Sequence, residues 1–520
     1  MSKALLCAMV LIESTVVTAT PQPRPSAPAQ PRTNIMHLVS QTPVVEPDGD
    51  FALRLRVTGV PSGARVHLEV RNRVPTRSDF KAALGGHVSR TVVGKPVEIA
   101  AVPDASGVVV ATITTRDPQT LQPVDPQDVR LAEGVYPVTV DLISSSGAAL
   151  DSLLTFLIRL PIAHDFTPMG VALVLPEGGP LAHQPDGSTA LDADVAQLML
   201  GDATVLEAHS SIPLTIAANP ETVEALEPKT LDELRKGAAG LRDEVARQFD
   251  VGFATIGAKL TTPDDTTYVS DGSLTTELAS TLQQRGVRSL VVPDEAVSRL
   301  DERVFNRTLT QPFGISGLAG VQAVSADGAL SAHAGESGDP VLDANHLLAD
   351  LGVLFFDDPP DKRAAVVAFG DDQRVDPQLL DALLTGLDPA SNRIMQPMTL
   401  ATMFATIPRA GSKGETNGKG APLMRTLTPA SSATDLSSFA SSLRDAEHDL
   451  DSYMTMITPD NPRAPEFVRR VLVTGSKDLT ESQRTQYLDG LRSTIRAEIH
   501  KIEPPPRQTI NFTARDGVVA

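Results

Sequence analysis

The stretch MGVALVLP, at residues 169–176, is an apolar run without a charged residue. A run of this length is typical of a strand that is buried on both faces, as in the parallel sheets of α/β proteins. Helical spacing follows at residues 191–200 (LDADVAQLML), and a second apolar run comes at residues 211–220 (SIPLTIAANP). Strand, helix and strand in this order predict parallel βα units that begin near residue 169.

The same alternation of strand and helix continues to residue 387. The glycine fingerprint GxGxxG of a dinucleotide-binding fold is missing from it. We therefore predict a distorted (β/α) barrel of deacetylase or glycosidase type over residues 165–408, with an open sheet as the alternative. The expected helices are 230–249, 273–286, 343–355 and 377–387, and the expected further strands are 251–258, 289–293 and 364–370.

The segment before the barrel has a period of two. Apolar residues alternate with polar ones at residues 51–57 (FALRLRV), 64–74 (ARVHLEVRNRV), 107–115 (GVVVATITT) and 134–144 (GVYPVTVDLIS). Turn-forming Gly, Pro, Asp and Ser separate these runs. Short alternating runs at this spacing are typical of an antiparallel sandwich, so we predict an immunoglobulin-like β-sandwich over residues 35–162.

The segment after the barrel changes to helical patterning. Residues 409–432 are rich in Gly, Pro, Ser and Thr and are expected to form a linker. Apolar residues at helical spacing then predict a helical hairpin or small bundle over residues 433–503. Residues 504–520 return to β character, and we interpret them as the start of a truncated β domain.

The N-terminus has the parts of an export signal. A basic start (MSK), a nine-residue apolar run at residues 4–12 and small residues near Ala19 predict a signal peptide over residues 1–20. A Pro-rich linker at residues 21–34 follows. The alternatives are a misassigned start or a disordered tail, because Glu13 lies just after the short apolar run. We expect an extracytoplasmic protein, secreted or in the cell envelope.

Composition limits the partners. The net charge of −19 disfavours nucleic-acid binding, because an acidic surface repels phosphate backbones. No later stretch is long and uncharged enough to span a bilayer, so membrane attachment is expected only through an anchor beyond this chain. Cys7 is the only cysteine, and removal of the signal peptide would leave none for a disulfide or a thiolate metal site.

The candidate site residues are those that follow predicted barrel strands. Parallel βα folds place their sites at the C-terminal ends of strands. This rule selects Asn219, the pair Asp294 and Glu295, and the pair Asp371 and Asp372. Such carboxylates can act as acid and base for glycoside cleavage or bind a metal for deacetylation. The interpretation we favour is that they cap the helices that follow.

Several familiar motifs are absent or misplaced. The acidic stretch DDPPD at residues 357–361 contains two prolines, which exclude the helix that a DDxxD metal site requires. An SxxK match at residues 78–81 lies in the β region, away from any predicted helix. HExxH, GxSxG and the phosphate-binding P-loop do not occur, and His183, His209 and His333 are scattered over predicted loops. We predict neither a cofactor nor a metal site.

Several segments follow one another in a set order: GVYPVTVDL, TFLIRLP, VALVLP, PLTIAANPETVEAL, VLFFDDP, LDALLTGL, MTLATMFATIP, SLRDAEHDLDSYM and TINFTARDG. This order resembles that of an uncharacterised secreted family of actinobacterial cell-envelope proteins, over residues 36–520. The resemblance implies a signal peptide, a β-sandwich, a degenerate sugar-hydrolase or deacetylase barrel, a helical segment, and a second β-sandwich before a C-terminal membrane anchor. It also implies a link to cell-wall assembly.

Two departures from the family pattern bear on chemistry. Asn219 stands where relatives tend to carry an aspartate, and only the displaced Asp264 and Asp265 match a pair of aspartates after the third strand. The resemblance therefore implies a chain without catalysis, which binds a wall polymer or a protein of the wall-building machinery. The alternatives are a carbohydrate-active hydrolase or deacetylase, and a pure scaffold in which the barrel spaces two sandwiches.

Overall fold

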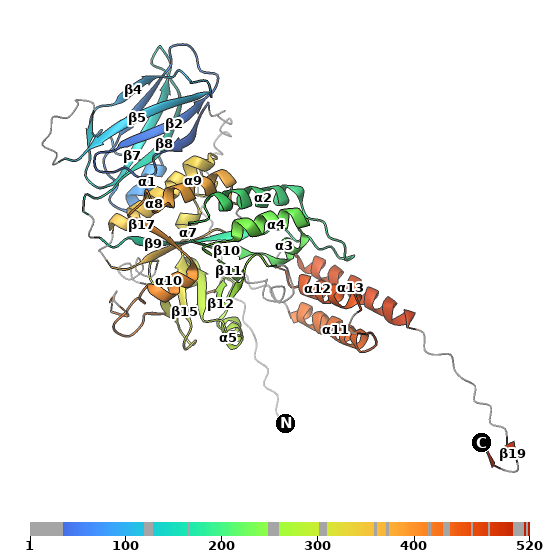
Figure 1. Cartoon of the computed structure of the whole chain (residues 1–520). Helices are drawn as coiled ribbons and strands as arrows, with labels where there is room; N and C mark the ends of the chain where they lie inside the picture. Colours follow the sequence, from blue (N-terminus) through green and yellow to red (C-terminus); the bar gives the residue numbers. More distant parts are fainter. Residues whose placement is uncertain are drawn as a thin grey trace, which may run out of the picture.

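A computed structural model describes residues 35–118, 128–163, 166–247, 259–300, 309–357, 361–370, 374–413, 415, 418–429, 437–458, 461–476, 479–502, 514–515 and 518–519. Three parts follow one another along the chain: a β domain, a barrel and a helical bundle (Figure 1). The expected signal peptide and Pro-rich linker lie outside the described residues. Within the described part, no helix has the length and apolar character needed to span a bilayer.

The β domain consists of two four-stranded sheets that share one core. Strand β2 (Asp50–Val57) alternates buried and less buried residues along its length, as its sequence predicts. Phe51, Leu53 and Leu55 pack against Val66 and Leu68 of the other sheet. One sheet has the order β1 (Met36–Gln41), β2, β5 (Val108–Arg116), β6 (Val129–Arg130), and the other has the order β4 (Val97–Ala100), β3 (Arg65–Val70), β7 (Gly134–Ile143), β8 (Ala149–Arg159).

Two details of the β domain differ from the prediction. Strand β6 pairs with β5 in parallel, so the first sheet is mixed; the immunoglobulin-like assignment stays a prediction. Helix α1 (Arg77–Leu84) lies between β3 and β4, where Thr76 caps it by accepting a hydrogen bond from the Asp79 amide. The SxxK match at residues 78–81 therefore lies on a helix, contrary to expectation, but Ser78 and Lys81 are both exposed on it.

The central part is a closed barrel of seven parallel strands. Each strand pairs with the next one in the ring, β13 pairs directly with β15, and β16 returns to β9, which closes the barrel. The prediction of a barrel is confirmed, and its deacetylase or glycosidase type stays a prediction. The seven strands are β9 (Met169–Glu177), β10 (Leu214–Ala218), β11 (Arg242–Arg247), β12 (Pro263–Val269), β13 (Ser289–Pro293), β15 (Gln322–Ala326) and β16 (Ala364–Ala368).

Small apolar side chains fill the barrel. Val174, Val291, Val324 and Val366 come from four strands and share one cluster. Helix α10 (Leu400–Thr406) closes the N-terminal end, where the Leu400 amide donates a hydrogen bond of 2.9 Å to the Thr215 hydroxyl. Strand β17 (Met395–Met398) leads into α10 and pairs with β9. This plug leaves the C-terminal strand ends as the place for a site.

Helices cover the outer face of β9, β10 and β16 (Figure 1). The expected helices 343–355 and 377–387 are confirmed as α8 and α9, and 273–286 as the shorter α5. Helix α2 begins with Asp192 as its N-cap and packs against α4 and α9. The helices are α2 (Ala193–Ala208), α3 (Pro220–Ala225), α4 (Pro228–Ala238), α5 (Thr276–Gln284), α7 (Gly328–Ser331), α8 (Pro340–Asp357) and α9 (Pro377–Leu387).

The predicted helix 230–249 is wrong in its second half. Helix α4 ends at Ala238, and strand β11 begins at Arg242. Gly240 between them has φ +100°, a left-handed conformation that glycine adopts without the strain other residues incur. The expected strand 251–258 lies outside the described residues, and the fourth barrel strand is β12, which the sequence did not predict.

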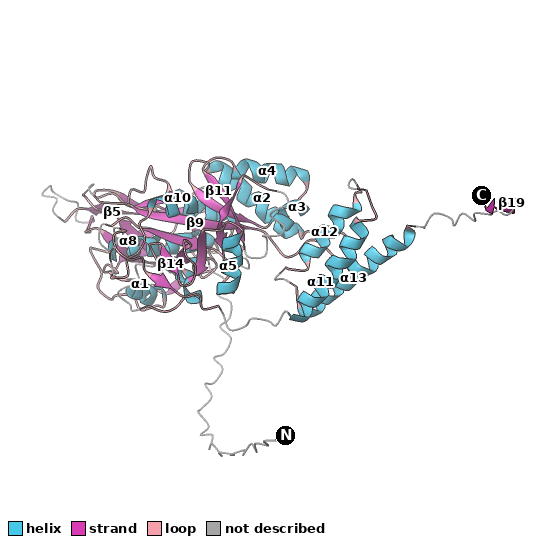
Figure 2. Ribbon diagram, turned by 90° about the horizontal axis from the view of Figure 1, so that it is seen from below, coloured by secondary structure: helices cyan, strands magenta, loops and turns pink. Residues whose placement is uncertain are grey.

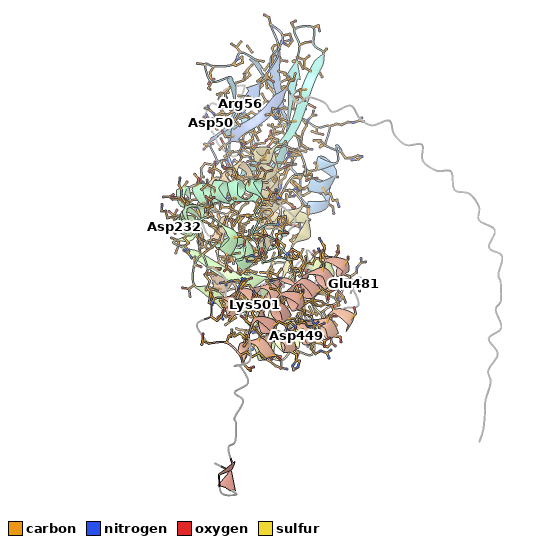
Figure 3. All side chains as sticks on the ribbon, turned by 90° about the vertical axis from the view of Figure 1, so that its right-hand side faces the viewer. Asp50, Arg56, Asp232, Asp449, Glu481 and Lys501 are labelled. Carbon is orange, nitrogen blue, oxygen red and sulfur yellow. The ribbon has the colours of Figure 1, made fainter. Side chains whose placement is uncertain are left out.

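Helices α11 (Ser437–Met454), α12 (Arg463–Val473) and α13 (Glu481–Lys501) form the predicted bundle (Figure 2). Tyr453, Phe467 and Leu491 meet in its core. The bundle lies on the far side of the barrel from the β domain (Figure 3). It contacts the loop after β9, where the Tyr487 hydroxyl donates to the His183 carbonyl at 2.8 Å.

Two short pairs of strands complete the fold. Strand β14 (Phe313–Ile315) pairs with β15 and with β18 (Met424–Arg425), so part of the expected linker 409–432 packs against the barrel. Leu423 and Leu427 of this segment are buried in the same cluster as Phe313. Strands β19 (Ala514–Arg515) and β20 (Val518–Val519) form an antiparallel pair near the C-terminus.

Gly237 sets how closely α4 approaches α2. A Cβ atom at Gly237 would lie 2.6 Å from the Ala203 carbonyl oxygen, which is rigid backbone. We expect Gly237→Ala to lower the free energy of unfolding by about 1–3 kcal/mol, because the two helices must separate. Denaturant unfolding followed by circular dichroism measures this change.

The matched control is Gly490→Ala in the interior of α13. A Cβ atom there would meet its nearest neighbour, the Pro185 carbonyl oxygen, at an ordinary 3.6 Å. This variant is expected to be more stable than the wild type by about 0.5–1 kcal/mol, since alanine restricts the unfolded chain. Equal effects of the two substitutions would show that the α2–α4 approach does not depend on Gly237.

Candidate functional site

Three of the five predicted site residues lie in the described part of the chain. Asn219 is the N-cap of α3, and its Oδ1 accepts hydrogen bonds from the Glu221 and Thr222 amides, so the capping interpretation is confirmed for this residue. Asp294 and Glu295 form the short 3-10 turn η2 (Asp294–Ala296) directly after β13. Asp371 and Asp372 lie outside the described residues.

Asp294 and Glu295 lie where two neighbouring strands end. Pro293 of β13 is opposite Ala326 of β15, so the two strands end side by side. A Cβ atom at Gly328, the first residue of α7, would lie 3.4 Å from Asp294 Oδ1 and 3.9 Å from Glu295 Oε2. Both acids therefore lie against the N-terminus of α7, with Asp294 half-buried and Glu295 exposed.

The two carboxyl groups interact directly. Burial raises the pKa of Asp294, and the hydrogen bond and the charge of Glu295 raise this pKa further. A direct hydrogen bond brings the carboxyl groups much closer than the roughly 5–9.5 Å that separates the two acids of glycosidases. As a pair, Asp294 and Glu295 lie too close together to stand on either side of a glycosidic bond.

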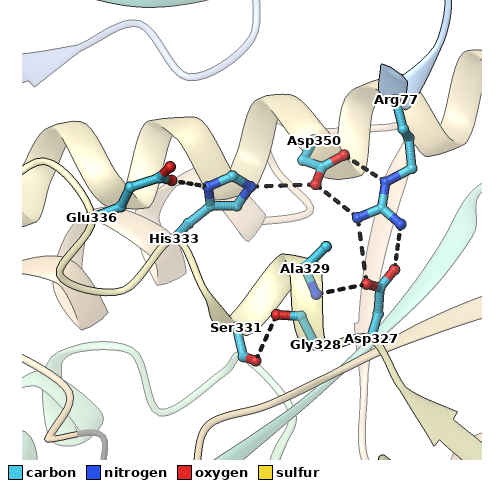
Figure 4. A network of polar contacts seen from close by, with 8 residues as sticks. All are labelled: Arg77, Asp327, Gly328, Ala329, Ser331, His333, Glu336 and Asp350. Carbon is cyan, nitrogen blue, oxygen red and sulfur yellow. Dashed lines mark hydrogen bonds and ion pairs between the residues drawn. The ribbon is translucent and has the colours of Figure 1, made fainter. Parts of the chain in front are cut away.

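Beside this pair lies a network of charged side chains that joins the barrel to the β domain (Figure 4). Arg77 of α1 is its centre. Its Nη1 donates to Asp327 Oδ2 at 2.6 Å, and its Nε and Nη2 donate to the two oxygens of Asp350, each at 2.8 Å. Asp327 follows β15 and also caps α7 by accepting from the Ala329 amide, while Asp350 lies on α8.

His333 extends the network. One ring nitrogen lies 2.9 Å from Glu336 Oε2 and the other 3.3 Å from Asp350 Oδ2. Burial alone would lower the pKa of His333, but the hydrogen bonds and charges of Asp350 and Glu336 raise it above its ordinary value. The His333 ring therefore favours the protonated form that donates to both acids.

The two aspartates of the network titrate in opposite directions. Burial alone would raise the pKa of Asp350, but Arg77 and His333 together lower it. Burial raises the pKa of Asp327, which has the single cationic partner Arg77 and also faces the charges of Asp350 and Asp294. Each side chain of this network thus has its partner inside the chain.

Sequence reasoning missed Arg77, Asp327 and Asp350. They lie 250 and 273 positions apart in the chain, and no local pattern links them. Asp327 obeys the strand-end rule, but the strand before it had not been predicted. Of the three scattered histidines only His333 joins the network, because His209 pairs with Asp381 and His183 contacts Thr189.

Metal-binding geometry is not found in the described ranges, where no group of three or more His, Cys, Asp and Glu side chains is arranged to hold an ion. No family model matches the chain, and no curated protein matches it.

Asp264 and Asp265 lie on β12, where Asp264 Oδ1 accepts hydrogen bonds from the Thr266 amide and hydroxyl.

Several solved structures are similar to parts of the chain at low identity. An exo-type maltose-forming amylase from Pyrococcus sp. ST04 has 10% identity and a TM-score of 0.39, over 65% of this chain and 72% of that chain. A family 76 glycoside hydrolase from a Bacteroides thetaiotaomicron strain has 13% identity and a TM-score of 0.14, over 24% and 20%. A β-glucuronidase of Parabacteroides merdae has 9% identity and a TM-score of 0.16, over 52% and 32%.

Proposed function

We propose that this chain is a non-catalytic binding or scaffold component of the cell envelope, linked to cell-wall assembly. The observation that carries the proposal is the Arg77 network. The side chains of Asp327 and Asp350 are each 4% exposed, and their carboxylate oxygens accept hydrogen bonds from Arg77. A catalytic acid must offer a proton or lone pair to a substrate, whereas these groups hold one domain on another.

The hydrophobic core supports a scaffold in the same region. Phe80 of α1 and Phe156 of β8 belong to the cluster that also contains Leu347 and Leu351 of α8. Leu342, near the start of α8, belongs instead to the core of the β domain. Helix α8 is thus packed into both domains, which makes the β domain and the barrel one structural unit that presents its surfaces at a constant spacing.

The location and the partner class come from the sequence. The signal-like N-terminus and the segment order support a role outside the cytoplasm. The family resemblance supports a wall polymer or a protein of the wall-building machinery as the partner.

A carbohydrate-active hydrolase or deacetylase is the second candidate, and the raised pKa of Asp294 favours it. Asp294 lies at the C-terminal end of β13 beside the exposed Glu295, the position at which barrel enzymes carry their catalytic groups. Because these two acids are hydrogen-bonded to each other, a glycosidase mechanism would need a further carboxylate, for which Asp371 and Asp372 after β16 are the candidates.

One experiment separates the two functions. The full chain is incubated with isolated cell walls of the native host, and the pellet is assayed for bound protein and the supernatant for released sugar and acetate. We expect wall-dependent sedimentation without product, and we expect the double variant Asp294→Asn, Glu295→Gln to sediment equally well, because the proposal gives this pair no part in binding.

The outcomes decide between the proposals. Product that accumulates with the wild type and is lost in the double variant would establish the hydrolase or deacetylase function instead. Absence of sedimentation would contradict wall binding, and a protein partner would then be tested with purified components of the wall-building machinery. Glu207→Gln, a change at an exposed acid on α2, is the matched control for loss of negative surface charge.

A further inference from the structure

Two acids are buried between the barrel and α2 without hydrogen-bond partners. Glu177 is the last residue of β9 and is 1% exposed, and Asp202 on α2 is 3% exposed. In the described structure, both carboxyl oxygens of Glu177 and Oδ1 of Asp202 are buried and accept no hydrogen bond. Unpartnered carboxylates are costly to bury, so these groups need a counter-charge or a proton.

The alternation of β9 explains how Glu177 comes to lie there. Leu173 and Leu175 belong to the cluster that packs against the outer helices, whereas Ala172 and Val174 belong to the cluster inside the barrel. Glu177 comes two residues after Leu175 and lies on the same face of β9, so its side chain points toward the helical layer that includes α2. It therefore lies outside the barrel mouth and is not one of the strand-end acids discussed above.

The charges that act on these acids are negative. Burial raises the pKa of Glu177 well above its ordinary value and that of Asp202 to about 8. The charge of Asp202 raises the pKa of Glu177 further, and that of Asp376, the N-cap of α9, acts on Asp202.

Several other charged groups on the packed elements have partners elsewhere, and Asp194, Glu207 and Lys229 are exposed. Glu221 of α3 accepts from the Ala182 and His183 amides. His209, which follows α2, pairs with Asp381 of α9. The remaining pairs are Glu224 of α3 with Arg469, Arg242 of β11 with the Leu206 and His209 carbonyls, and Arg235 and Lys236 of α4 with Asp232 and Glu233.

We propose that Glu177 and Asp202 form a buried proton-binding site that couples the packing of α2 on the barrel to pH. In the native chain the pair is held with bound protons, which leaves no net charge in the core. When the protons are lost, two negative charges face each other under α2, and the helix loosens. This inference is independent of the proposed envelope function.

The sign of the pH dependence follows from linkage. Because both native pKa values are raised, the folded chain binds more protons than the unfolded chain between the ordinary carboxyl range and about pH 8. The stability of the fold therefore falls as pH rises through this window. For each proton released, the unfolding constant rises about tenfold per pH unit.

The test compares unfolding of the full chain between pH 6 and pH 9. The variants are Glu177→Met, which replaces the acid with an apolar side chain of similar length, and Asp202→Asn. We expect the wild type to lose stability over this range and each variant to lose less. A variant that releases one proton fewer on unfolding should show a change in the unfolding constant per pH unit that is about tenfold smaller. Glu207→Gln, an exposed acid on α2, is the control and should behave as the wild type.

Local and competing outcomes are measured on the same proteins. Hydrogen exchange, corrected for its intrinsic pH dependence, should show α2 losing protection relative to α13 at pH 9 in the wild type but not in the variants. Equal pH slopes in wild type and variants would overturn the proposal. So would recovery of the wild type at pH 9 by millimolar Ca²⁺ or Mg²⁺, because a cation and not protons would then balance the pair. If Glu177→Met does not fold, Asp202→Asn alone decides.

Discussion

Arg77→Ala is expected to lower the free energy of unfolding by about 3–5 kcal/mol, because the buried Asp327 loses its cation and Asp350 keeps only His333. Arg77 makes bidentate contact with Asp350 and a 2.6 Å bond with Asp327, and both aspartate side chains are only 4% exposed to water. The lost free energy should come from weaker contacts at the interface between the β domain and the barrel. Denaturant unfolding at pH 7 measures it, and Arg56→Ala at an exposed site on β2 should change stability by less than about 0.5 kcal/mol.

The effect of Arg77→Ala should depend on pH. Arg77 acts to lower the pKa of both aspartates in the wild type, so its removal should raise both pKa values, less for Asp350 because His333 remains. The variant therefore binds more protons in its folded state, so its deficit relative to the wild type shrinks as pH falls from 7 toward 5. Adding Asp327→Asn and Asp350→Asn should restore part of the loss at pH 7. A deficit that is the same at both pH values would contradict a cost that arises from unpaired charge.

The barrel was predictable because several of its strands are buried on both faces. The run at residues 169–176 is apolar throughout since Leu173 and Leu175 contact the helices while Ala172 and Val174 fill the barrel. Strands of this kind carry their signal in the local sequence. The β domain was predictable for the converse reason, because one face of strands such as β2, β3 and β5 is less buried and the period of two is visible.

Strands β11 and β12 were not predictable, because their sequences are polar and they form strands through contacts with residues distant in the chain. In β11 (RDEVAR) the buried Glu244 accepts hydrogen bonds from the Leu260 and Thr261 amides. Arg242 of the same strand donates to the Leu206 carbonyl at the C-terminal end of α2. Neither partner is near in sequence, so the segment has the appearance of a continued amphipathic helix.

The candidate site was predictable only where one strand end was enough to identify it. Asp294 and Glu295 follow a strand that the sequence shows, so position alone selected them. The network beside them takes Arg77 from the β domain and Asp350 from the side of a long helix. Such a network arises from the packing of two domains, and a single sequence carries no spacing rule for it.

Phe156→Ala is expected to destabilise the chain by about 3–5 kcal/mol, the cost of a cavity left by a buried aromatic ring. Phe156 is fully buried, and its ring centre lies 4.5 Å from that of Phe80 and 5.7 Å from that of His346. Strand β8 is buried on both faces here, because Phe156 belongs to the cluster of the barrel helices and Leu157 to the core of the β domain. The cavity would therefore open between the two domains, and not within either of them.

This position makes Phe156→Ala a test of whether the β domain and the barrel unfold together. If they form one unit, both should unfold in a single transition at a lower denaturant concentration, as followed by tyrosine fluorescence and by circular dichroism. Phe439→Ala, a half-buried residue of the bundle, is the control and should leave that transition in place. A second transition in Phe156→Ala, with the barrel keeping its wild-type stability, would show that the Arg77 network and the shared core join two independent domains. This result would contradict the scaffold proposal, which requires a constant spacing between the two domains.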